Sequence, residues 1–200
     1  MANVDRPFGL RPIKHLKGGP WNGQTQLCYI PSTDSTRAFF IGDPVVRGGT
    51  ANSTGFCPTV TIATAGDANP IYGIITGFAE NPELLGLTYR LDDTGRYCFV
   101  CIDPDVIFEI QDDGVAVLGI TSVGRNANFI ATHAGSAITG KSGIELDSSG
   151  VTDDASFQFL ILAAGGDVTN DVTLARSTWE VLISQHQLRL AATDGGLLGT

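Results

Sequence analysis

The chain has 200 residues, of which 42% are hydrophobic, and it contains 25 glycines. This composition excludes a disordered chain and predicts a turn-rich fold that buries enough surface to be stable without a disulfide or a metal. The net charge of −9 argues against a nucleic-acid-binding surface, and no apolar run reaches the roughly 20 residues of a transmembrane helix. The first twelve residues lack the apolar core of a signal peptide, so we expect synthesis in the cytoplasm without secretion.

Residues 1–36 are predicted to form an extended N-terminal arm. Pro7, Pro12 and Pro20 interrupt any helix through this segment. Residues 1–17 carry four bases against one acid, whereas the rest of the chain is strongly acidic. We therefore expect the arm to dock on an acidic surface, which belongs either to a partner or to the arm's own domain.

Five residues of this arm are the predicted contacts with a partner. They are apolar or basic side chains chosen by composition, because no motif marks them: Phe8, Arg11, Ile13, Lys14 and Trp21.

Residues 37–200 read as one β-barrel domain of about ten short strands separated by Gly, Asn, Asp and Ser clusters. A turn is predicted at 42–44, a hairpin around 92–95, and short helical turns only within 81–86 and 113–121. The expected fold is an all-β antiparallel barrel. Strands are predicted within 37–49, 59–64, 70–82, 87–102, 128–132, 143–150, 156–166 and 178–190.

Alternation predicts which faces of the last two strands are buried. These faces carry Phe157, Phe159 and Ile161 in one strand and Trp179, Val181 and Ile183 in the other.

Cys98 and Cys101 form a Cys-x-x-Cys motif, which raises the question of a redox or metal site. In a strand, their side chains point to opposite faces and their Cα atoms lie roughly 10 Å apart. A disulfide requires about 7 Å or less, so the two cysteines are not expected to bridge. Cys28 and Cys57 stand alone, which does not match zinc-ligand spacing. Both faces of 97–102 are apolar, so this strand is expected to be covered on both sides, as a central strand or at a subunit contact.

Asp103-Pro104-Asp105 is predicted to be a turn, because Asp and Pro favour its first two positions. The alternative is a calcium or magnesium site that also uses 92–93 or 112–113, although no twelve-residue calcium loop is present.

Gly135–Ser142, "GSAITGKS", matches the phosphate-binding pattern Gly-x-x-x-x-Gly-Lys-Ser. A working phosphate loop opens a helix, whose N-terminal amides hold the phosphates. The following "GIELDSSG" predicts a short strand instead, so a turn is the preferred interpretation.

No Gly-x-Ser-x-Gly or His-Glu-x-x-His motif is present, and no spacing selects a pair of catalytic carboxylates. The sequence therefore predicts no enzyme, no catalytic residue and no cofactor or metal.

Several phrases resemble structural proteins of tailed bacteriophages, in particular the capsid decoration, or cement, proteins. They are "MANVDRPFGLRPIKHLKGGPWNGQ", "FFIGDPVV", "IYGIITGF", "DPDVIFEI" and "SGIELDSS". The resemblance implies a barrel of β-tulip or jelly-roll type. It also implies a virion protein on the outer capsid surface that clamps neighbouring major capsid subunits, often as a homotrimer, and it implies no catalytic residue.

Two other functions remain open. One is a different virion component, such as a tail, head-fibre or host-glycan-binding domain, which would use exposed aromatic residues; the candidates are Trp21, Tyr72, Tyr89 and Trp179. The other is a barrel enzyme or a carrier of a small ligand.

Overall fold

The computed structural model describes residues 3–34, 37–131 and 134–189 and is built from β-strands with one short 3₁₀ turn. The predicted all-β fold is confirmed. The strands are β1 (Arg11–His15), β2 (Gln26–Ile30), β3 (Pro44–Ala51), β4 (Pro58–Ile62), β5 (Gly73–Phe78), β6 (Arg96–Cys101), β7 (Val106–Gln111), β8 (Asn126–Ala127), β9 (Phe129–Ile130), β10 (Glu145–Leu146), β11 (Phe159–Ala164) and β12 (Thr178–Ile183), with the turn η1 at Ile120–Ser122.

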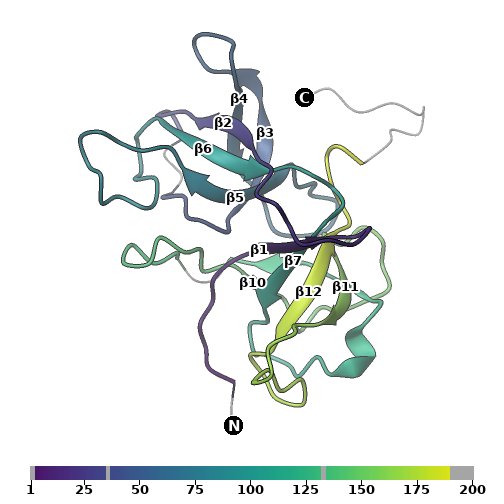
Figure 1. Ribbon diagram of the computed structural model, residues 1–200. Coiled ribbons are helices and arrows are strands. Elements are labelled where there is room, and N and C mark those ends of the chain that lie inside the picture. The colour runs from purple at the N-terminus through teal and green to yellow at the C-terminus, as the bar shows by residue number, and fades with distance from the viewer. Residues whose placement is uncertain (1–2, 35–36, 132–133, 190–200) are drawn as a thin grey trace.

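The strands form two main units that pack against each other (Figure 1). One unit is an open sheet of order β1-β7-β12-β11-β8, and β9 and β10 form a small separate ladder. In the other unit, β2, β4, β3, β5 and β6 pair in that order and β6 pairs back to β2; we call it the strand ring. The β2–β4 contact is a single parallel pair, Tyr29 with Thr59, whereas the other pairings between described strands are antiparallel.

The segment predicted as an N-terminal arm contributes a strand to each unit. β1 pairs with β7 in the open sheet, and β2 pairs with β6 in the strand ring. Of the two alternatives that the sequence left open, the structure shows the arm packed on its own domain. The predicted boundary after residue 36 lies beside 35–36, outside the described residues.

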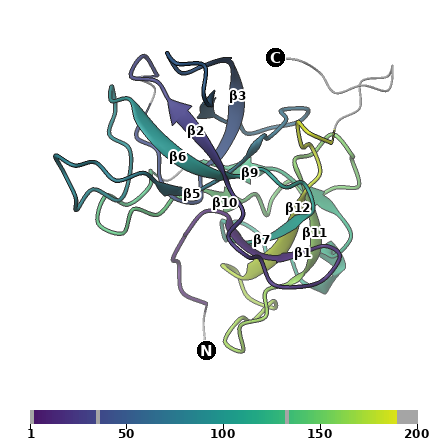
Figure 2. The same ribbon diagram turned by 45° about the horizontal axis from the view of Figure 1, so that its top comes forward.

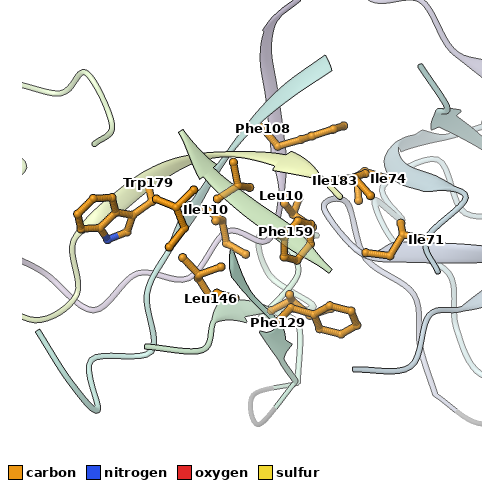
Figure 3. Packing of buried hydrophobic residues seen from close by; sticks show 14 of the residues in the cluster. Leu10, Ile71, Ile74, Phe108, Ile110, Phe129, Leu146, Phe159, Trp179 and Ile183 are labelled. Carbon is orange, nitrogen blue, oxygen red and sulfur yellow. The ribbon is translucent and has the colours of Figure 1, made fainter. Parts of the chain in front are cut away.

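Two hydrophobic clusters stabilise the molecule. The interior of the strand ring holds Val60, Cys98 and Val100. The larger cluster fills the space between the open sheet and the ring, where Ile71 and Ile74 from the ring side approach Phe159 and Ile183 of the sheet (Figure 3). Because apolar burial is the main source of folding free energy, this shared cluster holds the two units together.

The predicted buried faces of the last two strands are confirmed at five positions. Phe159, Ile161, Trp179, Val181 and Ile183 are all at most 1% exposed. The sixth residue, Phe157, lies before β11 and is half-buried.

The hairpin predicted around residues 92–95 is wrong. Asp92 and Asp93 do form a turn, but Arg90 pairs with Phe39 and not with β6. The Arg90 side chain explains the difference, because it is fully buried and donates hydrogen bonds to the carbonyls of Pro31, Asp34, Arg37 and Thr94.

A close backbone junction joins the N-terminal segment to both units. The Leu10 amide donates to the Gly42 carbonyl, and the Gly42 amide donates to the Ile75 carbonyl. The buried Asp43 carboxylate accepts from the Ser142 hydroxyl at 2.5 Å and from the Arg37 guanidinium at 3.0 Å. Burial raises the pKa of this carboxyl, and Arg37 and Ser142 oppose the rise.

A substitution at Gly9 measures how tightly this junction is packed. Gly9 has φ 71°, and a Cβ there would lie 2.6 Å from the Ser142 Cβ and 2.7 Å from the Gly42 oxygen. Gly23 has a similar φ of 84° but open space around it. Gly23→Ala is expected to cost about 1–2 kcal/mol for the backbone conformation, and Gly9→Ala about 1–3 kcal/mol more for overpacking. Urea unfolding of both variants measures the difference, and equal losses would contradict the close packing.

Candidate adhesion surfaces

Arg11 and Lys14 of β1 neutralise a pair of glutamates on the open sheet. Glu109 of β7 and Glu180 of β12 lie directly opposite each other, a position in which like charges repel. Arg11 forms an ion pair with Glu109, and Lys14 forms one with Glu180 at 2.6 Å. The acidic surface on which the basic segment docks is therefore its own sheet.

His15 and Lys17 of the segment also lie beside acids of the same chain. His15 lies 3.2 Å from Asp103, and Lys17 lies 3.3 Å from Asp105. Little positive charge of residues 11–17 is left for a separate partner.

The three apolar predicted contacts are half-buried. The Phe8 ring lies under the Arg11 guanidinium, 5.1 Å from its carbon. The Trp21 amide donates to the Ile13 carbonyl, and the Trp21 side chain packs against the larger hydrophobic cluster. The structure thus places all five predicted residues on one segment but engages them within the chain, and their contact with a partner stays a prediction.

A surface cavity of about 370 Å³ lies where the N-terminal segment meets the loop 165–178. Phe8 and Arg11 line it together with Glu109, Gln111 and Thr178. Arg11 and Glu109 are paired with each other, so the cavity presents mixed and largely satisfied polar groups.

Cys98 and Cys101 are buried and unbridged, as predicted from the strand geometry. All four cysteines are free, and Cys98 faces the ring interior whereas Cys101 joins the larger cluster. Burial raises the pKa of Cys101 to about 11 and that of Cys28 to about 12, so these thiols stay protonated at neutral pH. The motif packs the interior and offers no reactive thiolate.

Asp103-Pro104-Asp105 forms the predicted turn. The Asp105 amide donates to the Asp103 carboxylate at 2.8 Å, and Asp105 also pairs with Arg189. Within the described residues, no group of three or more His, Cys, Asp or Glu side chains is arranged to hold a metal ion.

The phosphate-loop pattern at Gly135–Ser142 is a turn between strands. No helix follows it, and the hydroxyl of its Ser142 is used by Asp43. The tip of the turn carries Ile138, which is 95% exposed.

This turn lies beside a second loop with an apolar tip. Gly140 packs against Thr88, so residues 136–140 and 81–88 touch at their bases. In both views the two loops project from the same side of the molecule (Figures 1 and 2). Leu84 and Leu85 are 52% and 78% exposed. We call this surface the paired loops.

A second apolar surface lies on the outside of the strand ring. Tyr29 is paired with Tyr97, and Leu27 with Phe99, across β2 and β6. Tyr97 is 39% and Phe99 38% exposed, and the Tyr29 and Tyr97 rings lie 5.0 Å apart. We call these four residues the aromatic face.

β6 is a central strand, as predicted, because it pairs with both β2 and β5, and Cys101 at its end is buried. The aromatic face corrects the expectation of cover on both sides at Tyr97 and Phe99. Cys98 and Val100 point into the ring, whereas Tyr97 and Phe99 point outward and are only partly covered, at 39% and 38% exposed; the Asn52 side chain donates a hydrogen bond to the Tyr97 hydroxyl. The alternative of a subunit contact stays a prediction.

The aromatic residues proposed for glycan binding do not gather on the surface. Tyr72 and Trp179 are buried, Tyr89 stacks on Phe40 at 5.0 Å, and Trp21 packs against the core. Sequence reasoning missed both apolar surfaces. Their signals were the Tyr-Cys-Phe-Val alternation in β6 and the "ELL" and "AIT" phrases inside turns.

No family model, curated protein or solved structure matches the chain. In the part of the chain that the structure describes, no helix is long and apolar enough to cross a bilayer.

The charge neutralisation by β1 gives a testable stability effect. Replacing both Arg11→Gln and Lys14→Gln is expected to lower the free energy of unfolding by about 1–2 kcal/mol at low salt, because Glu109 and Glu180 are left facing each other. Adding Glu180→Gln to that double variant should recover part of the loss.

Lys17→Gln is the control, because its side chain is 86% exposed, and a change within about 0.5 kcal/mol is expected. Urea unfolding at low and high salt provides the measurement. A loss that does not depend on salt, or that Glu180→Gln does not rescue, would refute the electrostatic role of β1.

Proposed function

We propose that this chain is a structural virion protein that binds the outer surface of a tailed-phage capsid and stabilises contacts between major capsid subunits. The resemblance of five segments to capsid decoration proteins supports the proposal, and so does the all-β architecture. A protein of this kind needs surface side chains that bind its partner, and it needs no catalytic centre.

The segments that carry the resemblance are in contact in the folded chain. "FFIGDPVV" supplies Gly42 and Asp43, which bond to Ile75 of "IYGIITGF" and to Ser142 of "SGIELDSS". Gly9 of the N-terminal phrase packs against Gly42 and Ser142. These segments therefore meet at the junction that joins the N-terminal segment to both units. We infer that the strand ring is the small barrel, of β-tulip or jelly-roll type, that the resemblance implies.

The single observation that carries the proposed adhesion is the exposure of the paired loops. Turn tips of soluble chains usually present polar residues, because these residues remain hydrated. Here Leu84, Leu85 and Ile138 are exposed to water on two loops whose bases touch at Gly140 and Thr88. Burial of such side chains in a partner releases about 1.5–3 kcal/mol each, so three of them supply a useful part of the binding free energy.

A repeated lattice multiplies a modest contact. A specific interface usually buries about 800 Å² on each partner, and two short loops cover less than that. When several copies are held together, later contacts become intramolecular, which raises avidity by roughly 10² to 10⁴. A homotrimer, as in the family, would give the paired loops this advantage, and the net charge of −9 would keep free copies soluble.

Binding to shells tests the proposal. Purified chain is expected to co-sediment saturably with expanded shells that lack it, at a fixed number per major capsid subunit. Replacing Leu85→Ser and Ile138→Ser together should weaken binding at least tenfold, because two exposed anchors are lost. Val168→Ser is the matched control, since Val168 is 99% exposed on a different loop.

Point substitutions are needed because deletion of residues 1–36 would remove β1 and β2 and damage both units. Failure of the wild-type chain to bind shells would overturn the proposed function. Full binding by the double variant would remove the paired loops from it.

A further inference from the structure

The aromatic face is a defined and rigid surface. Leu27, Tyr29, Tyr97 and Phe99 form two directly opposed pairs on neighbouring strands, so their backbones are fixed by the β2–β6 ladder. Tyr29 is held in place because Gly95 leaves room for it; a Cβ at Gly95 would lie 2.1 Å from the Tyr29 hydroxyl oxygen. The side chains are thus ordered before any partner arrives.

The face is also uncharged within an acidic chain. The outward positions in this part of β2 and β6 carry Leu27, Tyr29, Tyr97 and Phe99 and no acid. Elsewhere several basic residues are paired with acids of the same chain, as are Arg11 with Glu109 and Lys14 with Glu180. Two copies with a charge of −9 repel each other at long range.

We propose that the aromatic face is where one copy of this chain contacts a second copy. Like-charged chains associate at least cost where neither presents an acid, and burial of exposed aromatic side chains supplies the favourable free energy. The shape favours a protein over a sugar, because the Tyr29 and Tyr97 rings are tilted by 50° and do not form a flat platform for a pyranose. A second set of protruding side chains can interdigitate with them.

The biological role of this contact rests on the proposed function, because associated copies would hold several shell subunits at once. The contact itself needs no shell. Self-association and shell binding can therefore fail independently.

Sedimentation velocity of the full chain over a range of protein concentrations tests the proposal. The wild-type chain is expected to form oligomers as its concentration rises, and Phe99→Lys should weaken the association at least tenfold by placing a charge in the contact. Val168→Lys adds the same charge at a fully exposed site on another loop and should leave the association unchanged. Circular dichroism and thermal unfolding of each variant check that the fold is intact.

A wild-type chain that stays monomeric at every concentration would overturn the proposal, and so would oligomers that Phe99→Lys leaves unchanged. Binding of a monomeric chain to an immobilised glycan, abolished by Tyr97→Ser, would assign the face to carbohydrate instead. Oligomers without shell binding would leave this contact standing and overturn the proposed function alone.

Discussion

Glu109 and Glu180 lie opposite each other on neighbouring strands. Their carboxylates repel each other unless cationic side chains lie beside them. Arg11 and Lys14 provide those cations from β1. This interaction fixes the N-terminal segment on the open sheet, where Gly9 then packs into the junction with Gly42. It also pairs, with acids of the same chain, basic residues that the sequence alone predicts to contact a partner.

The remaining surface is acidic and interrupted by uncharged apolar areas. The paired loops present aliphatic side chains at turn tips, and the aromatic face presents paired rings on a rigid ladder. The two surfaces come from different elements, so the proposed shell contact and the proposed contact with a second copy would not compete for the same side chains.

The sequence predicted strands where side chains alternate strongly. In β12, Trp179, Val181 and Ile183 share one face and are buried as the alternation predicts, while Thr178 and Glu180 on the other face are partly exposed and Leu182 is buried as well. The prediction of a hairpin at 92–95 failed because the buried guanidinium of Arg90 binds the nearby carbonyl of Thr94 and three carbonyls that are distant in sequence, which no local pattern reveals. In β6 both faces are apolar, and alternation cannot tell a face covered by the chain from one left to solvent. The paired loops depend on a tertiary contact between Gly140 and Thr88, which no short-range pattern encodes.

The number and position of copies in an intact particle test the account most directly. Electron cryomicroscopy of the mature virion, with quantitative mass spectrometry of its proteins, measures both. The account predicts density for this chain on the outer shell surface, in a fixed ratio to the major capsid protein, with residues 81–88 and 136–140 against the shell. A few copies per particle, or density at the tail or inside the shell, would contradict it.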